Sequence, residues 1–310
     1  MNLNRSACEI VREMVARSEE LGVEVRRAGG ATLIDCGVRV PGSFAAGAMF
    51  AEACMGGLGR VKVSMHDYGF GMLPVVEVEV RKPAIACLGS QKAGWKLAEG
   101  DFFSLGSGPA RILARKPAST YRALGYEEES DVAVIALEAP APPPEKLVEE
   151  IARECGVEQE NLYILLAPTA SIAGSLQVSA RVVETALYRA MHLNMDVNAV
   201  RSALGRAPVA PVVGGDAAMM GVTNDMIIYG GEVYLVAEGF EASKLVSSSS
   251  TSYGKPFAEV FREAGYDFYR VDPAIFAPAR VTVNQPESGE MSTAGKLNVE
   301  VLMRSAGMLR

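Results

Sequence analysis

Strand patterns and helix patterns follow one another along this chain of 310 residues without a regular alternation of one strand and one helix. Residues 23–36 read as a strand, a turn at Gly29-Gly30 and a second strand. Residues 61–65 and 75–80 alternate between apolar and polar side chains, as half-buried strands do, and the apolar run 84–88 predicts a buried strand. This mixture of hairpins and helices predicts the α+β class, with mixed and antiparallel sheets, rather than a doubly wound parallel sheet.

The middle of the chain contains the clearest combination of elements. A strand at 131–137, a helix at 145–155 and a strand at 161–166 form a βαβ-like segment. A long helical pattern follows and runs without a break from residue 172 to about residue 193.

The last third of the chain predicts a hairpin over residues 225–237 that turns at Gly230-Gly231. A strand and a helix are expected close to the C-terminus. We expect residues 1–90, completed by residues 270–310, to form a first α+β domain and residues 91–269 to form a second.

Charge and hydropathy exclude several classes of protein. The net charge of -7, the pI near 5.2 and the lack of any Lys/Arg block argue against nucleic acid as the main partner. No apolar run reaches the 18 residues of a membrane span. The first 15 residues have helical amphipathic spacing instead of the pattern of a signal peptide. A cytoplasmic protein is expected.

Cysteines and histidines are too few and too scattered to suggest a metal site. The five cysteines are widely separated, form no CxxC pair and are expected to be reduced thiols in or near the core. Only two histidines occur, His66 and His192, whereas a catalytic zinc usually needs three protein ligands. We therefore expect no metal.

Arg181 and Glu184 are three residues apart in the long helical pattern, so they share one helix face. Gln177 extends a polar strip toward them, and the small residues at 173–175 and 179–180 allow close packing against the same helix. Such a pair is usually a surface ion pair that contributes little to stability, but in this setting it also fits a cleft. Both interpretations remain open on spacing alone.

Three further segments carry groups that can hold a ligand. The turn at 106–111 combines glycine N–H groups, a helix start and Arg111, which are the parts of an anion site; a tight glycine loop explains it equally well. Asn224 and Asp225, and the loop with Lys255, are polar clusters that either bind a ligand or satisfy backbone groups.

A set of short motifs is distributed in a specific order over nearly the whole chain. The motifs are D-C-G-V-R-V-P-G-S at 35–43, L-G-S-Q-K-A-G-W at 88–95, G-S-G-P-A-R at 106–111, A-P-T-A-S-I-A-G-S-L-Q-V-S-A-R-V-V-E at 167–184, T-N-D-M-I-I-Y-G-G at 223–231, Y-G-K-P-F at 253–257, D-F-Y-R-V-D-P at 267–273 and A-G-K-L-N-V-E-V-L at 294–302. Together they resemble the methenyltetrahydromethanopterin cyclohydrolase family of methanogenic and related archaea and some methylotrophic bacteria, which acts in one-carbon metabolism.

This resemblance implies two α+β domains with the substrate pocket between them, a homotrimer, and neither a metal nor an organic cofactor, the tetrahydromethanopterin derivative being the substrate. It also implies that Arg181 and Glu184 are the catalytic pair. Together with the polar segments above, it leads us to expect substrate contacts at Gln91, Ser107, Arg111, Asn224, Asp225 and Lys255.

The implied reaction adds water to the methenyl cation and yields the formyl compound, with Glu184 as general base and Arg181 orienting it. Two alternatives use the same ligand: a pterin-dependent formyl transferase, which needs a second substrate, and a non-catalytic pterin-binding protein. A deaminase-like hydrolase is more distant, because such enzymes usually need a zinc site.

Overall fold

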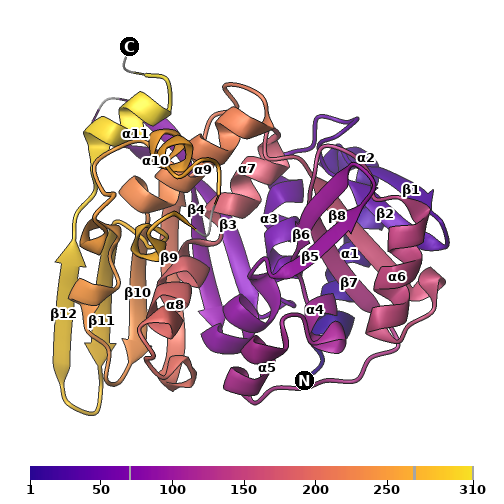
Figure 1. The fold of residues 1–310 in the computed structure, drawn as a ribbon, viewed down its shortest axis with the longest axis horizontal. Coiled ribbons are helices and arrows are strands. Elements are labelled where there is room, and N and C mark those ends of the chain that lie inside the picture. Colours follow the sequence, from indigo (N-terminus) through magenta and orange to yellow (C-terminus); the bar gives the residue numbers. More distant parts are fainter. Residues whose placement is uncertain (70, 268–269, 309–310) are drawn as a thin grey trace. The chain divides into compact units, whose positions relative to one another are not determined.

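The computed structural model describes residues 1–69, 71–267 and 270–308 (Figure 1). The chain divides into two compact units. The first unit contains residues Met1–Arg60 and Ile85–Gln177, and the second contains Val61–Ala84 and Val178–Arg310. These bounds differ from the predicted domains 1–90 with 270–310 and 91–269, because the C-terminal strands pair inside the second unit.

The first unit is built on a four-stranded sheet in the order β1-β2-β8-β7. Its strands are β1 (Glu24–Ala28), β2 (Ala31–Asp35), β7 (Ala133–Glu138) and β8 (Leu162–Ala167). β1 and β2 form the predicted hairpin, whereas β2, β8 and β7 run parallel. Helix α6 (Glu145–Cys155) connects β7 to β8, which confirms the βαβ segment.

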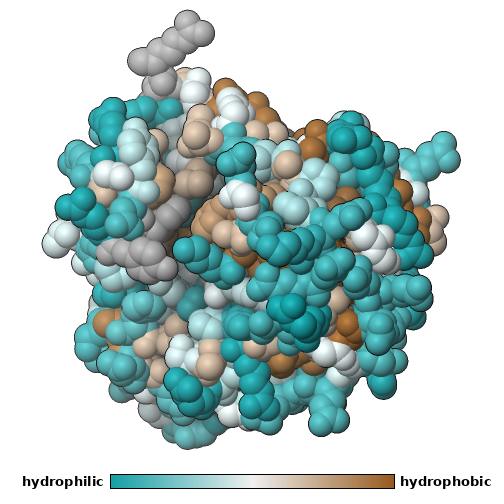
Figure 2. Space-filling model, turned by 45° about the vertical axis from the view of Figure 1, so that its right-hand side comes forward, coloured by the Kyte–Doolittle hydropathy of each residue, from teal (hydrophilic) through white to brown (hydrophobic). Residues whose placement is uncertain are grey.

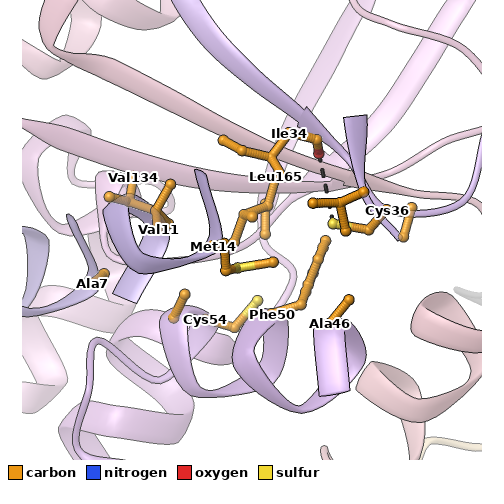
Figure 3. Packing of buried hydrophobic residues seen from close by; sticks show 14 of the residues in the cluster. Ala7, Val11, Met14, Ile34, Cys36, Ala46, Phe50, Cys54, Val134 and Leu165 are labelled. Atoms are coloured by element: carbon orange, nitrogen blue, oxygen red, sulfur yellow. Dashed lines mark hydrogen bonds between the residues drawn. The ribbon is translucent and has the colours of Figure 1, made fainter. Parts of the chain in front are cut away.

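Helices cover both faces of this sheet, so its central strands are apolar on both sides. Ile164 and Leu166 of β8 belong to the core on the side of α6 and α4 (Ala110–Ala114). Leu165 of β8 faces the opposite way, toward α1 (Leu3–Ala16) and α3 (Phe44–Cys54). Figure 3 shows this second layer, in which the labelled side chains of α1, α3 and the sheet meet. The alternation of β8 between two cores explains its continuous apolar sequence.

The remaining elements of the first unit are short. They are α2 (Ser18–Leu21), the π-helix η1 (Ala84–Gln91), the antiparallel hairpin β5 (Trp95–Glu99) and β6 (Phe102–Gly106), α5 (Ala118–Leu124), the 3₁₀ turn η2 (Gln159–Asn161) and α7 (Ile172–Ser179). The predicted strand at 84–88 is wrong, because these residues lie in η1. In η1 the carbonyl of Gly89 accepts a hydrogen bond from the Tyr121 hydroxyl at 2.8 Å.

The second unit is built on a six-stranded sheet in the order β12-β11-β10-β9-β4-β3. Its strands are β3 (Gly59–Asp67), β4 (Met72–Arg81), β9 (Val200–Pro208), β10 (Glu232–Ala237), β11 (Arg280–Gln285) and β12 (Glu290–Gly295). β4 with β9, β9 with β10 and β11 with β12 are antiparallel, whereas β10 and β11 are parallel. The strands predicted at 61–65, 75–80 and 281–284 are all present, and the class α+β with mixed sheets is confirmed.

The helices of the second unit correct two predictions. They are α8 (Val182–His192), α9 (Asp216–Gly230), α10 (Phe257–Glu263) and α11 (Val299–Ser305), with 3₁₀ turns η3 (Val197–Ala199), η4 (Ala242–Lys244), η5 (Ser247–Ser249) and η7 (Pro273–Ile275). The hairpin at 225–237 is wrong, because its first half is the end of α9. The single long helix at 172–193 is also wrong, because the chain turns at Ala180 and Arg181 and α8 begins afresh.

The surface and the thiols agree with the sequence-based picture. Hydrophilic side chains cover most of the face drawn in Figure 2, with smaller hydrophobic areas between them. All five cysteine thiols are buried, as predicted. Across the three described ranges, no helix combines the length and the apolarity needed to cross a membrane.

Candidate active site

Arg181 and Glu184 stand at the start of α8 rather than inside one continuous helix. Arg181 occupies the N-cap position, and its carbonyl accepts the first helical hydrogen bond, from the Thr185 N–H at 2.9 Å. Glu184 is in the first turn, and its side chain is only 8% exposed. The free N–H groups and the positive end of the helix dipole stabilise a negative charge at this position.

Two contacts to β9 hold the start of α8 in place. The Ser179 hydroxyl donates to the carbonyl of Pro208 at 2.8 Å, just before the helix begins. Val182 and Val183 pack over Gly205, where an added Cβ would lie 2.6 Å and 2.7 Å from their methyl groups. Glycine at this strand position lets the first turn of α8 approach the backbone of β9.

Gln91, Ser107 and Arg111 all lie in the first unit. Ser107 forms an isolated bridge with Ala136, and the next residue, Gly108, donates its N–H to the Ser90 carbonyl at 2.9 Å. Gly108 has a φ of +92°, and an added Cβ would lie 3.0 Å from a backbone carbonyl of β7. The glycine turn is thus needed for close backbone packing. All three predicted side chains are buried.

The guanidinium of Arg111 is fully buried and faces backbone carbonyls. Its Nε donates to the backbone carbonyl of Lys116 at 2.9 Å, and its Nη1 donates to the backbone carbonyl of Lys92 at 2.5 Å. Nη1 also lies 3.3–3.4 Å from the carbonyls of Leu88, Gly89 and Ser90. These contacts bind the end of η1 and its following loop to α4. They give Arg111 a structural role, and its contact with substrate stays a prediction.

Asn224, Asp225 and Lys255 all lie in the second unit. The Asn224 amide donates back to the Met220 carbonyl on its own helix at 2.8 Å. Asp225 accepts from the Phe257 N–H at 2.8 Å and from the Ser305 hydroxyl at 2.6 Å. Its side chain therefore connects α9 with the start of α10 and with the end of α11.

The 253–257 loop is attached to the same helix one turn later. The Tyr229 hydroxyl donates to the Lys255 carbonyl at 2.5 Å and accepts from the Gly254 N–H at 3.0 Å. The Lys255 ammonium is exposed and pairs with Glu263 at 2.8 Å. The motifs at 223–231 and 253–257 are thus joined by Asp225 and Tyr229.

Burial raises the pKa of Asp225 from its ordinary 3.8 to about 7, against the hydrogen bonds from Ser305 and Phe257, which lower it. The folded protein then holds a proton that the unfolded chain has released between these two pH values. Stability from this group is complete below pH 3.8 and is lost as pH rises through 7.

Asp225→Asn is accordingly expected to remove this pH dependence, since asparagine resembles the protonated acid in shape and hydrogen bonding. Between pH 5 and pH 8 the variant should gain about 3 kcal/mol relative to the native protein, at most, which is two pKa units at about 1.4 kcal/mol each. Urea unfolding at both pH values measures the difference. Identical pH dependence in the two proteins would show that Asp225 is ionised in the fold throughout this range.

Glu138 is a residue that the sequence reasoning missed. It ends β7, and its carboxylate accepts from the Thr169 hydroxyl at 2.5 Å and from the Gln177 amide at 3.0 Å. A carboxylate directly after a buried parallel strand was the available signal, because ligands often bind at the carboxyl ends of such strands.

Other expectations concern metals and the tail motif. Within the described residues, no three His, Cys, Asp or Glu side chains gather into a group that could hold a metal ion. Phe268 and Tyr269 of the 267–273 motif lie outside the described residues.

The fold and the start of α8 together describe an α+β protein with a buried glutamate three residues after an arginine. Comparison with known proteins makes the assignment specific. The family model described as Cyclohydrolase (MCH) matches residues 2–306.

Several relatives align over nearly their whole length. The methenyltetrahydromethanopterin cyclohydrolase of Methanocaldococcus jannaschii is 48% identical over 318 residues, which cover 99% of this chain and 98% of that protein. The proteins of the same name from Methanothermobacter marburgensis and Methanospirillum hungatei are 46% and 44% identical, with 99% and 100% of this chain and 100% of each relative covered. The chain belongs to the methenyltetrahydromethanopterin cyclohydrolase family.

Proposed function

We propose that the protein interconverts 5,10-methenyltetrahydromethanopterin and 5-formyltetrahydromethanopterin by adding water to the methenyl cation, a reaction of one-carbon metabolism in methanogenesis. The observation that carries this proposal is the family match over residues 2–306. The burial of Glu184 in the first turn of α8, three residues after Arg181, supports it.

The substrate determines what the site has to do. Its bridging carbon lies between two nitrogens that share a positive charge, so this carbon is already electrophilic. Glu184 accepts a proton from a water molecule as the water oxygen forms a bond to that carbon. The negative charge of Glu184 also attracts the cation. Arg181, three residues earlier, orients the carboxylate.

The adduct then collapses to the product. The bond from the bridging carbon to nitrogen 10 breaks, its electron pair stays on that nitrogen, and the nitrogen takes up a proton. The hydroxyl of the adduct loses its proton as the carbonyl of the formyl group forms on nitrogen 5. Cation and water thus give the neutral formyl compound and one released proton.

The remaining parts of the proposal concern substrate contacts and assembly. We propose contacts at Gln91, Ser107, Arg111, Asn224, Asp225 and Lys255. Among these, the exposed Lys255 ammonium can exchange Glu263 for a ligand at the least cost, because surface ion pairs contribute little. A cytoplasmic homotrimer that needs no cofactor completes the proposal.

The test uses the purified protein and methenyltetrahydromethanopterin without a second substrate. The absorbance of the methenyl group should disappear with time, in proportion to the amount of protein. Binding of the compound without a spectral change would identify a non-catalytic pterin-binding protein. A change that occurs only after a second substrate is added would identify a transferase.

A further inference from the structure

The carboxyl ends of three parallel strands meet at one edge of the first unit's sheet, and Glu138 ends one of them. Asp35 ends β2, Glu138 ends β7, and Thr169 follows β8 by two residues. Ligands of sheets with parallel strands bind outside such ends. A carboxylate at this edge can bind a ligand only if some of its hydrogen-bond acceptor positions are not already used within the protein.

Asp35 has little capacity left. Its two oxygens accept from the backbone N–H groups of Gly37, Val38 and Arg39 at 2.7–3.0 Å, which folds the following loop around the carboxylate. The side chain is also buried. Most of the acceptor capacity of Asp35 is therefore used in shaping its own loop.

Glu138 is half-buried and accepts two hydrogen bonds, one on each oxygen. Oε1 accepts from the Thr169 hydroxyl and Oε2 from the Gln177 amide. Both donor side chains are buried, so they fix the plane of the carboxylate. A carboxylate can accept about four hydrogen bonds, which leaves roughly one acceptor position on each oxygen. Among the described residues, no lysine or arginine forms an ion pair with Glu138.

Glu128 of the same unit shows what a purely structural carboxylate looks like. It is also half-buried, and it accepts from the backbone N–H groups of Leu3 and Asn4, from the Asn4 amide and from the Tyr126 hydroxyl. These four donors match its acceptor capacity. Glu138 is half-buried like Glu128, but only two donors in the described part of the chain form hydrogen bonds to its carboxylate.

We propose that Glu138 binds the substrate through the donor edge of the pterin ring. This edge presents a ring N–H and the neighbouring exocyclic amino group side by side. Two parallel N–H groups match the two remaining acceptor positions of one carboxylate, as in bidentate recognition of a guanidinium. Thr169 and Gln177 are positioning residues that hold the carboxylate in register. This inference rests on the proposed pterin substrate.

The first experiment compares Glu138→Gln with the native protein in the methenyl absorbance assay. Loss of a charge-assisted hydrogen bond should raise the KM by about 10- to 100-fold, while kcat changes by less than about threefold, as expected for binding that is equal in ground and transition states. Glu128→Gln is the matched control, and it should lower the Tm without changing the KM. Thr169→Val keeps the carboxylate and should raise the KM much less than Glu138→Gln.

The second experiment leaves the native protein unchanged and so does not depend on whether a variant folds. Free pterin should inhibit turnover at a concentration at least about tenfold below that of lumazine, which has a carbonyl in place of the amino group. Equal inhibition by the two compounds, or an unchanged KM in folded Glu138→Gln, overturns the inference. Either of these two results can be obtained only if the native protein turns over the methenyl compound. If the proposed function itself is wrong, the native protein shows no turnover, so the two kinds of failure can be distinguished.

Discussion

Glu184→Gln is expected to lower kcat by about 100- to 10,000-fold, which is the usual contribution of a general base. Glutamine keeps the size of the side chain and can still bond to a water molecule, but it cannot take the proton. The fold should be retained, because the amide also fits the N-terminal turn of α8. The methenyl absorbance assay gives kcat, and circular dichroism monitors the fold.

A glutamate at the same helix position provides the control. Glu259 is the third residue of α10, as Glu184 is of α8, and both lie in the second unit. Glu259→Gln should leave kcat nearly unchanged. Turnover of Glu184→Gln within threefold of the native rate would remove Glu184 from the mechanism and leave the pair with Arg181 a structural one.

Gly174→Ala is expected to have the largest effect on stability. A Cβ at this position of α7 would lie 1.9 Å from the carbonyl oxygen of Pro168, so the helix start and the loop before it would have to separate. The same loop is fixed by the Ser171 hydroxyl, which donates to that carbonyl and accepts from the Gly174 N–H. We expect the free energy of unfolding to fall by about 3 kcal/mol, the upper range for overpacking.

Urea unfolding of Gly174→Ala measures this loss, with Gly215→Ala as the control. Gly215 caps α9, and an added Cβ there meets no atom within 4 Å, so its substitution should cost no more than about 1 kcal/mol. Equal losses in the two variants would mean that the approach of Pro168 to α7 does not limit stability.

The elements that were predicted correctly have local signals of their own. Helix α6 lies between Pro144 and Gly156, and its apolar residues recur at helical spacing. The β1–β2 hairpin has glycines at its turn. Helix α9 lacks such signals, because it is buried over most of its circumference from Met219 to Gly230 and its apolar residues show no period. The glycine pair after it therefore suggested a hairpin.

Long-range contacts account for what the sequence could not reveal at the candidate site. Ala180 and Arg181 are ordinary helix residues, and the break there accompanies the hydrogen bond from Ser179 to the distant Pro208. Arg111 offers the charge of an anion site, yet its partners are carbonyls of η1, of the loop after it and of Lys116. The type of residue was informative, but its partners depend on tertiary packing.

The interleaving of the two units has a consequence for biosynthesis. Residues 61–84 emerge from the ribosome with the first unit, yet they belong to the second. The first unit contains every segment it needs once residue 177 has been made, with this stretch looped out. β4 then waits for β9, its neighbour in the sheet, which starts only at Val200. Its exposed strand edge is a hazard for aggregation during that interval, so the nascent chain is at greatest risk between the synthesis of these two strands.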